Sequence, residues 1–370
     1  MTARVLHVVE AIEGGVARHV RDVVGRVDAE HIVVLPPERV GGFTDTPAVE
    51  AMAEAGAEIH VVPMRRSAVD PRNIAAVPRI RGVIRRARPH VVHGHASIGG
   101  AAARIAATGS GAARVYTPNG LLPSRAALAA ERALGRLTDR FVAVSPTEAE
   151  QVSRLRLVPR ERIEIIPNGI ELDVPGPPTA DLRAELGVDP TTPLVGTVGR
   201  VAAQKAPEVF VRACARVSVT VPEARFVMVG DGPLADLVST EVRTNGLQGR
   251  FLHVRGLHGA ATVMGQLDVF VLASRYEGGP YAPLEAMRAG TPVVLTDVVG
   301  NRDTIADGVS GLLVPPDDPG PLAAAVERLL GDPGLRERLG AAGRARFASR
   351  YDVGRMADRL EALYRALVST

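Results

Sequence analysis

The sequence contains no tryptophan, and aromatic residues make up only 3% of its 370 residues. Proteins that stack sugars or single-stranded nucleic acids on aromatic platforms need more of these side chains. The one cysteine, Cys214, excludes disulfides within the chain and thiolate metal clusters, which indicates a reducing compartment. The sequence therefore argues against a carbohydrate-binding module and against a nucleic-acid partner.

Long apolar runs are also missing, and none approaches the roughly 20 residues that span a bilayer. The first apolar run, from Val5 to Val9, ends at Glu10 and is too short for the core of a secretory leader. We therefore expect a soluble, cytoplasmic protein. The sequence does not indicate its oligomeric state.

Lysine is nearly absent as well, since Lys205 is the only lysine among 44 basic residues. A bias toward arginine and alanine of this kind is typical of a GC-rich genome. A lysine kept against that bias directs attention to the loop in which it stands.

The rest of the composition, 46% hydrophobic and 23% charged, is that of a folded globular protein long enough for two α/β domains. Short β-branched runs alternate with helical periodicity, a pattern typical of parallel sheets. Helices are predicted at residues 15–27, 71–87 and 124–137, among others. Strands are predicted at residues 4–9, 31–35, 58–63, 90–93, 114–117, 140–144, 162–166, 194–198, 225–229, 251–255, 269–272, 292–295 and 311–314.

Prolines crowd residues 168–193 and interrupt this alternation, which predicts an interdomain linker. We expect a Rossmann-like domain over residues 1–170, the linker over 171–192 and a second Rossmann-like domain over 193–350. A C-terminal helix over 351–370 is expected to cross back to the first domain. Two such doubly wound sheets would face a central cleft, with ligands at the carboxyl ends of the strands.

The first strand of the second half runs into Gly199 and Arg200, and Lys205 follows five residues later. The glycine lets the backbone turn, and both cations are good partners for phosphate oxygens. Solvated loop charges are the alternative interpretation of this pair.

Two glutamates eight residues apart, Glu277 and Glu285, bracket a Gly/Pro loop and a predicted helix start. The free amides at such a helix start bind anions such as phosphate. A glutamate one turn into the helix can accept hydrogen bonds from a ribose diol, although an ordinary exposed helix residue is the alternative for Glu285. Gly230 lies in a separate strand-to-helix turn that is generic when taken alone.

Together these motifs resemble the retaining glycosyltransferases of family 4, which have the GT-B fold, over nearly the whole chain. The resemblance implies that Arg200 and Lys205 bind the donor diphosphate, that Glu285 binds the ribose, and that Glu277 holds the transferred sugar. The donor-binding residues that it implies are Gly14, Gly15, Gly199, Arg200, Lys205, Gly230, Arg255, Gly256, Leu257, Glu277, Gly278, Gly279, Pro280, Tyr281, Ala282 and Glu285. Those implied at the reacting centre are Arg200, Lys205, Glu277 and Asn119.

In the first half, Gly14 and Gly15 precede a predicted helix and permit close approach of a ligand, although a simple strand-to-helix turn explains them as well. His93 and His95 lie at the end of a predicted strand and are candidates for contact with the acceptor, with a structural role as the alternative. They lack further cysteine or carboxylate ligands nearby in sequence, so we expect no metal and no cofactor.

The sequence departs from the family at Asn119, where relatives often carry a histidine that contacts the transferred sugar. Asparagine donates and accepts hydrogen bonds but does not titrate near neutrality. Either catalysis here needs only a hydrogen bond, which we favour, or the activity is altered.

Between Arg65 and Arg88 the sequence has eight arginines and one acid, Asp70. Such a segment could dock on an anionic surface at the inner face of the cell membrane, or on an acidic acceptor. The alternative is an ordinary surface helix, because Ile80 and Ile84 form one stripe and Arg81 and Arg85 the next.

The resemblance implies transfer of a hexose or N-acetylhexosamine from a nucleoside-diphosphate sugar, with UDP favoured, to an acceptor hydroxyl, with retention and without a metal. Secondary metabolites and cell-surface glycans are the acceptor classes we consider. The alternatives are a sugar-nucleotide epimerase, a non-catalytic nucleotide-sugar binder, and a phosphorylase that uses pyridoxal phosphate. The last conflicts with the assignment of the only lysine to the diphosphate.

Overall fold

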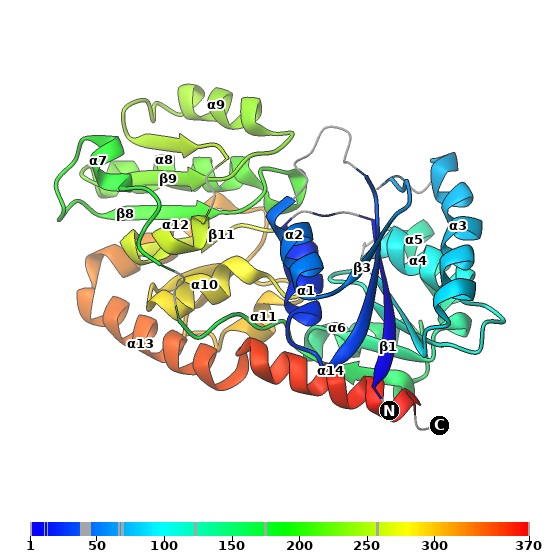
Figure 1. Ribbon diagram of the computed structural model, residues 1–370. Coiled ribbons are helices and arrows are strands. Elements are labelled where there is room, and N and C mark those ends of the chain that lie inside the picture. Colours follow the sequence, from blue (N-terminus) through cyan, green and yellow to red (C-terminus); the bar gives the residue numbers. More distant parts are fainter. Residues whose placement is uncertain are drawn as a thin grey trace. The chain divides into compact units, whose positions relative to one another are not determined.

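The structure, a computed structural model, describes residues 2–10, 12, 14–37, 46–65, 67, 70–121, 124–173, 176–256 and 259–368. The chain forms two compact units. The first contains Met1–Asn168 and Val353–Thr370, and the second contains Gly169–Asp352. In Figure 1 the first unit is blue to cyan-green with a red helix, and the second is green to orange.

The first unit is built on a seven-stranded parallel sheet with the order β3-β2-β1-β4-β5-β6-β7. Its strands are β1 (Ala3–Val9), β2 (Ala29–Leu35), β3 (Glu58–Val61), β4 (Val91–His95), β5 (Ala113–Thr117), β6 (Arg140–Ala143) and β7 (Ile163–Ile165). Its helices are α1 (Gly14–Val24), α2 (Thr46–Glu54), α3 (Pro71–Ala87), α4 (Ser97–Ala106), α5 (Arg125–Leu134), α6 (Pro146–Arg154) and α14 (Val353–Val368), with 3-10 turns η1 (Gly135–Leu137) and η2 (Arg160–Arg162).

Alternation along these strands sends side chains to two different helix layers. On one face, residues such as Leu6 and Val92 pack against α3 and α4. On the other face, Val5 and Val91 pack against α14, and Val33 packs against α1 and α2. The C-terminal helix is therefore part of the core of the first unit.

The second unit is built on a six-stranded parallel sheet with the order β10-β9-β8-β11-β12-β13. Its strands are β8 (Leu194–Val198), β9 (Arg225–Val229), β10 (Phe251–Val254), β11 (Val269–Leu272), β12 (Val293–Thr296) and β13 (Leu312–Val314). Its helices are α7 (Leu182–Leu186), α8 (Pro207–Thr220), α9 (Ala235–Thr244), α10 (Tyr281–Ala289), α11 (Asn301–Thr304), α12 (Pro319–Gly331) and α13 (Pro333–Arg350), with 3-10 turns η3 (Ala203–Lys205) and η4 (Ala260–Gln266).

The predicted doubly wound α/β class is confirmed, and every predicted strand overlaps an observed one. The described part of residues 171–192, the expected linker, is grouped with the second unit, and its role as a linker stays a prediction. Asp181 caps α7 by accepting hydrogen bonds from the amides of Arg183 and Ala184, and Leu182 is fully buried in the core of that unit. Leu182 therefore packs this part of the segment onto the core of the second unit.

Candidate active site

The strand order of the second sheet reverses between β8 and β11. From β8 the chain moves outward to β9 and β10, and then returns to place β11 on the other side of β8. In open parallel sheets, ligands bind outside the carboxyl ends of the two strands that flank such a reversal. The loops that begin at Gly199 and at Ala273 leave the sheet at this point.

Lys205 and Glu277, from these two loops, form an ion pair. The Nζ atom of Lys205 lies 2.5 Å from Oε1 of Glu277. The carboxylate is only 7% exposed, and it also accepts hydrogen bonds from Ser274 Oγ at 2.6 Å and from Gln204 Nε2 at 3.3 Å. A carboxylate with three donors is held rigidly, and it fixes the ammonium group beside it.

Further hydrogen bonds join the same two loops. The amide of Arg275 donates to the carbonyl of Gln204 at 2.8 Å, and Gln204 Nε2 donates to the carbonyl of Tyr276 at 2.9 Å. The guanidinium of Arg275 donates to the carbonyl of Ala203 and pairs with Glu208. The loops therefore form one bonded unit although their residues are 72 apart in sequence.

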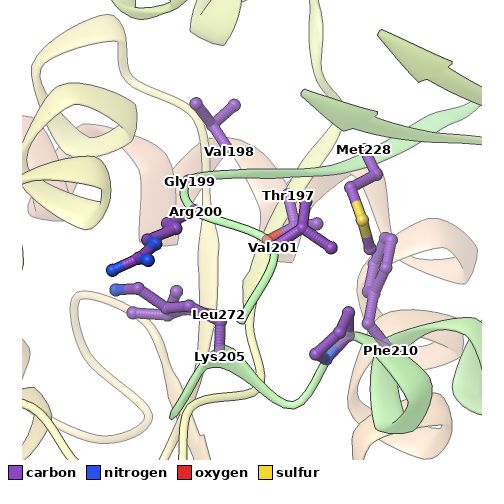
Figure 2. A pocket seen from close by; sticks show the side chains of 10 residues that line it. Thr197, Val198, Gly199, Arg200, Val201, Lys205, Phe210, Met228 and Leu272 are labelled. Carbon is purple, nitrogen blue, oxygen red and sulfur yellow. The ribbon is translucent and has the colours of Figure 1, made fainter. Parts of the chain in front are cut away.

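Arg200 and Lys205 line a pocket at the end of β8 together with the apolar side chains of Phe210, Met228 and Leu272. Figure 2 shows both charged ends on the side of the loop that faces away from Phe210 and Met228. Two cations on one side of a loop are suited to a ligand with more than one negative charge.

Helix α10 starts directly after the Glu277 loop. Pro280 occupies its N-cap position and supplies no side-chain hydrogen bond to the first amides. The backbone from Gly278 to Ala282 therefore has the form of an anion-binding helix start. Glu285, in this helix, is only 8% exposed, which contradicts the alternative of an ordinary exposed residue.

Glycines at Gly199 and Gly230 allow two of these loops to touch. A Cβ atom on Gly230 would lie 2.0 Å from the carbonyl oxygen of Gly199, and both residues have positive φ angles. In the same way, a Cβ atom on Gly300 would lie 2.3 Å from the carbonyl of Gly278. The structure thus gives Gly230 a packing role, and its contact with a donor stays a prediction.

Arg255 and Gly256, predicted near the base of the nucleotide, are exposed at the end of β10. Arg255 pairs with Asp231 at 2.9 Å, and its hydrogen bond holds the pKa of that carboxyl group below its usual value. Leu257, predicted with them, lies outside the described residues.

In the first unit, the order reversal lies between β1 and β4. Gly14 and Gly15 begin α1 after β1, and Gly14 has a φ of +57°, a conformation that favours glycine. The prediction that this strand ends at His93 is wrong, because β4 runs on to His95 and both histidines are fully buried. The two nitrogens of His93 are bonded to Tyr364 Oη at 2.6 Å and to Thr117 Oγ1 at 2.7 Å, so hydroxyl groups of the protein occupy them.

Asn119 has a φ of +54°, and its Nδ2 atom is buried without a hydrogen-bond partner among the described residues. The next residue, Gly120, donates its amide to Oε1 of Glu148 at 3.2 Å. Oε2 of Glu148 accepts from the amide of Val144 at 2.8 Å. Glu148 is fully buried and holds this loop, but the sequence offered no motif that marked it.

Three buried histidines, His7, His93 and His95, place ligand atoms within 4.8 Å of one another. Imidazole nitrogens at such distances could bind a transition metal. All of their nitrogens except Nδ1 of His95 are already bonded to other imidazoles or to hydroxyl groups, so a metal held by all three would have to displace such bonds. The absence of a metal stays a prediction.

The two halves of the chain match two family descriptions. "Glycosyltransferase Family 4" matches residues 13–174, and "Glycosyl transferases group 1" matches residues 178–346. The chain is similar to alpha-maltose-1-phosphate synthase of Mycolicibacterium smegmatis, with 32% identity over 74% of this chain and 78% of that protein. It is also similar to alpha-D-kanosaminyltransferase of Streptomyces kanamyceticus, with 35% identity over 51% of this chain, but that match spans only 49% of the relative.

Solved structures share the fold at lower identity. HepE of Anabaena, crystallised with UDP and glucose, has a TM-score of 0.83 and 18% identity over 98% of this chain and all of that one. Sucrose-phosphate synthase of Thermosynechococcus elongatus has a TM-score of 0.83 and 23% identity over the full length of both chains.

Replacing Lys205 by methionine is expected to destabilise the second unit, because Glu277 would remain buried without its cation. A loss of about 1–3 kcal/mol is expected for such a group. Calorimetry of Lys205→Met can be compared with Arg212→Met, which breaks a 2.6 Å pair whose arginine is 51% exposed. The control should lose about 0–1 kcal/mol; equal losses in the two variants would contradict the buried-pair interpretation.

The stability of the first unit is expected to fall as the pH drops below about 6.5, the ordinary pKa of histidine. Burial lowers the pKa of His7, His31, His93 and His95, and lowers that of His19 to about 4. These groups are neutral when folded and take up protons on unfolding, so their stabilisation is complete above 6.5 and declines toward pH 4.

Each such histidine contributes a slope of up to about 1.4 kcal/mol per pH unit. Thermal unfolding measured from pH 7.5 to 4.5 checks this, with His31→Gln expected to flatten the slope. His60→Gln, at a partly exposed position of β3, is the matched control for the substitution itself. A melting temperature that stays constant from pH 6.5 to 5 would be incompatible with this account.

Proposed function

We propose, since this chain belongs to glycosyltransferase family 4, that it moves a hexose or N-acetylhexosamine from a nucleoside-diphosphate sugar to an acceptor hydroxyl. The observation that carries this proposal is the bonded pair of loops at the strand-order reversal of the second sheet. There Lys205 and Glu277 are fixed against each other beside Arg200 and the start of α10. The negative charge of a diphosphate is complementary to Arg200 and Lys205, and a sugar hydroxyl can donate a hydrogen bond to the carboxylate of Glu277.

UDP is the nucleotide we favour. HepE, which shares the fold, was crystallised with UDP-glucose. Relatives of similar sequence are named as transferases of amino sugars, among them the 2-deoxystreptamine N-acetyl-D-glucosaminyltransferase of Streptomyces fradiae. These names support a sugar donor and a small polar acceptor, as in secondary-metabolite or cell-surface glycan synthesis.

In the proposed reaction the bond between C1 of the sugar and the β-phosphate oxygen breaks, and a bond from C1 to the acceptor oxygen forms. The acceptor proton passes to the departing diphosphate. Arg200 and Lys205 stabilise the negative charge that develops there, and the amides at the start of α10 add to this field. These groups supply the positive charge that a metal supplies elsewhere, so we propose a metal-independent reaction.

We propose retention of the anomeric configuration, with the acceptor attacking from the face that the diphosphate leaves. Glu277 forms an ion pair with Lys205 and accepts hydrogen bonds from Ser274 and Gln204. A carboxylate held by these three donors is a poor nucleophile. Its role is to accept hydrogen bonds from the transferred sugar. Asn119, whose amide nitrogen has no partner among the described residues, is proposed to donate a hydrogen bond near the reacting centre.

The purified protein is expected to turn over UDP-glucose or UDP-N-acetylglucosamine with a polyol or aminocyclitol acceptor. NMR of the product should show the anomeric configuration of the donor. Lys205→Met should reduce kcat/KM by about 100-fold or more, because transition-state charge loses a partner worth about 3 kcal/mol. Arg212→Met, which breaks an exposed pair with Glu241 and changes no residue of the pocket lining, should leave it unchanged.

An inverted product would refute retention, and full activity of Lys205→Met would refute the role of that lysine. Conversion of the donor sugar without an acceptor would identify an epimerase instead. Donor binding, seen as a rise in melting temperature, without turnover across the acceptor panel would identify a binding protein.

The outer face of α3 supports a peripheral contact with anionic lipid. Its inner face packs Ala76, Ile80 and Ile84 into the core, as the surface-helix interpretation predicts. Its outer face exposes Arg79, Arg85 and Arg86, and also Ile74, which is 77% exposed. No helix among those described combines the length and apolar composition needed to cross a bilayer. We propose that this face binds an anionic membrane surface, where each arginine contributes about 1 kcal/mol.

The protein is expected to sediment with phosphatidylglycerol vesicles and not with phosphatidylcholine vesicles. Changing Arg79, Arg85 and Arg86 to serine should abolish sedimentation. The matched control changes three exposed arginines of α13, Arg338, Arg344 and Arg350, to serine and should keep it. If the unmodified protein fails to sediment with anionic vesicles, the membrane proposal is wrong.

A further inference from the structure

A band of polar side chains crosses one face of the first sheet. Apolar residues that pack against α14 lie on one side of it, and apolar residues that pack against α1 and α2 lie on the other. The band is made of His7 on β1, His31 on β2, His93 and His95 on β4, Thr117 on β5 and Tyr364 on α14. Every one of these side chains is buried.

Three of the imidazoles form a chain that ends on a backbone carbonyl. His95 Nε2 lies 3.1 Å from His7 Nδ1, and His7 Nε2 lies 3.1 Å from His31 Nδ1. His31 Nε2 lies 3.0 Å from the carbonyl oxygen of Val27. A neutral imidazole has one donor and one acceptor nitrogen, and a carbonyl oxygen can only accept.

The carbonyl of Val27 therefore determines which nitrogen carries the proton in each of the three imidazoles. His31 must carry its proton on Nε2, which leaves Nδ1 to accept from His7 Nε2. His7 Nδ1 must then accept from His95 Nε2. Burial lowers the pKa of all three histidines, which keeps them neutral and makes this the only arrangement that satisfies each bond.

The chain leaves one lone pair unused, at Nδ1 of His95. This atom is buried and has no hydrogen-bond partner among the described residues. A buried acceptor without a partner is costly and calls for an explanation. His95 is the last residue of β4, one of the two strands that flank the order reversal of this sheet, where ligands bind.

Two neighbouring features agree with a ligand at this end of β4. The ring of His19, one turn into the helix that begins at Gly14 and Gly15, lies 5.4 Å from the ring of His95. Ala96, which follows His95, has φ 55° and ψ −171°, a strained conformation for a residue with a side chain. Strained residues of this kind concentrate at functional sites.

We propose that His7 and His31 are positioning residues that hold His95 in one tautomer, so that its Nδ1 atom accepts a hydrogen bond from a substrate hydroxyl. This rests on the proposed function only for the source of the hydroxyl, which is either the transferred sugar or the acceptor. The positions of the protons follow only from the hydrogen bonds that link His95, His7, His31 and the carbonyl of Val27.

Histidine-selective ¹⁵N NMR tests the tautomers directly. In the unmodified protein at pH 7.5, His7, His31 and His95 are expected to carry their protons on Nε2. His31→Phe removes the acceptor of His7, so the reversed chain becomes available and His95 is expected to carry its proton on Nδ1. His31→Gln is the matched control, because its amide oxygen can accept from His7 while its amide nitrogen donates to Val27. His95 is expected to keep its tautomer in that variant.

The substrate contact is tested by ligand titration in the same spectra and by kinetics. UDP-glucose, or UDP with a polyol acceptor, is expected to shift the Nδ1 resonance of His95, while UDP alone is expected to leave it in place. His31→Phe is expected to raise one KM about tenfold, and His31→Gln to restore it. A raised KM for UDP-glucose identifies the transferred sugar, and a raised KM for the polyol identifies the acceptor.

Other results would overturn the proposal. A proton on Nδ1 of His95 in the unmodified protein excludes it, as does a His95 resonance that no probe moves. Stoichiometric zinc in the purified protein would show that His7, His93 and His95 serve as ligands instead. Failure of the proposed transfer would appear differently, as absence of turnover by a protein whose histidines have the expected tautomers.

Discussion

The strand order of each parallel sheet is the constraint on which the candidate site depends. In each unit the first strand lies inside the sheet, and the chain builds outward from it in one direction before returning to build in the other. The loops after β1 and β4, and after β8 and β11, consequently leave the sheet as neighbours. Residues far apart in sequence then meet without any long-range element dedicated to joining them.

The two units differ in the groups that they place at this position, which are charged in the second unit and neutral in the first. In the second unit the loops carry charged side chains that form ion pairs. Lys205 pairs with Glu277, and Arg255 pairs with Asp231. In the first unit the corresponding band is made of buried neutral imidazoles and hydroxyl groups. Fixed cations suit a diphosphate, whereas oriented neutral groups suit hydroxyl groups, which are recognised by the direction of a hydrogen bond.

The sequence predicted the strands well, because β-branched runs bounded by turn residues are a local signal. It also predicted the loops that hold Lys205 and Glu277, through the resemblance to a known family. It could not predict that these two residues form an ion pair, because that contact depends on β11 lying beside β8.

The sequence prediction was wrong where a residue is explained by a tertiary contact, as at the end of β4. The strand was predicted to end at His93, but it continues through Gly94 to His95. A Cβ atom on Gly94 would lie 2.6 Å from Cα of Gly100, so the glycine is needed for close packing of α4 on the sheet. The hydrogen-bonded histidines could not be predicted from the sequence either. His7, His31 and His95 come from three strands, and only the pairing of those strands brings them together.

The departure at Asn119 is best understood through the backbone. The residue has a left-handed conformation, and asparagine and histidine are both among the residues that tolerate it. The hydrogen bond that the Gly120 amide donates to Glu148 holds the loop whatever side chain precedes it. An asparagine therefore preserves the shape of the loop and a donor nitrogen, and it removes only the ability to titrate. A reaction in which the departing diphosphate takes the proton does not need that ability, whereas a reaction that needed a titrating base at this position would lose it.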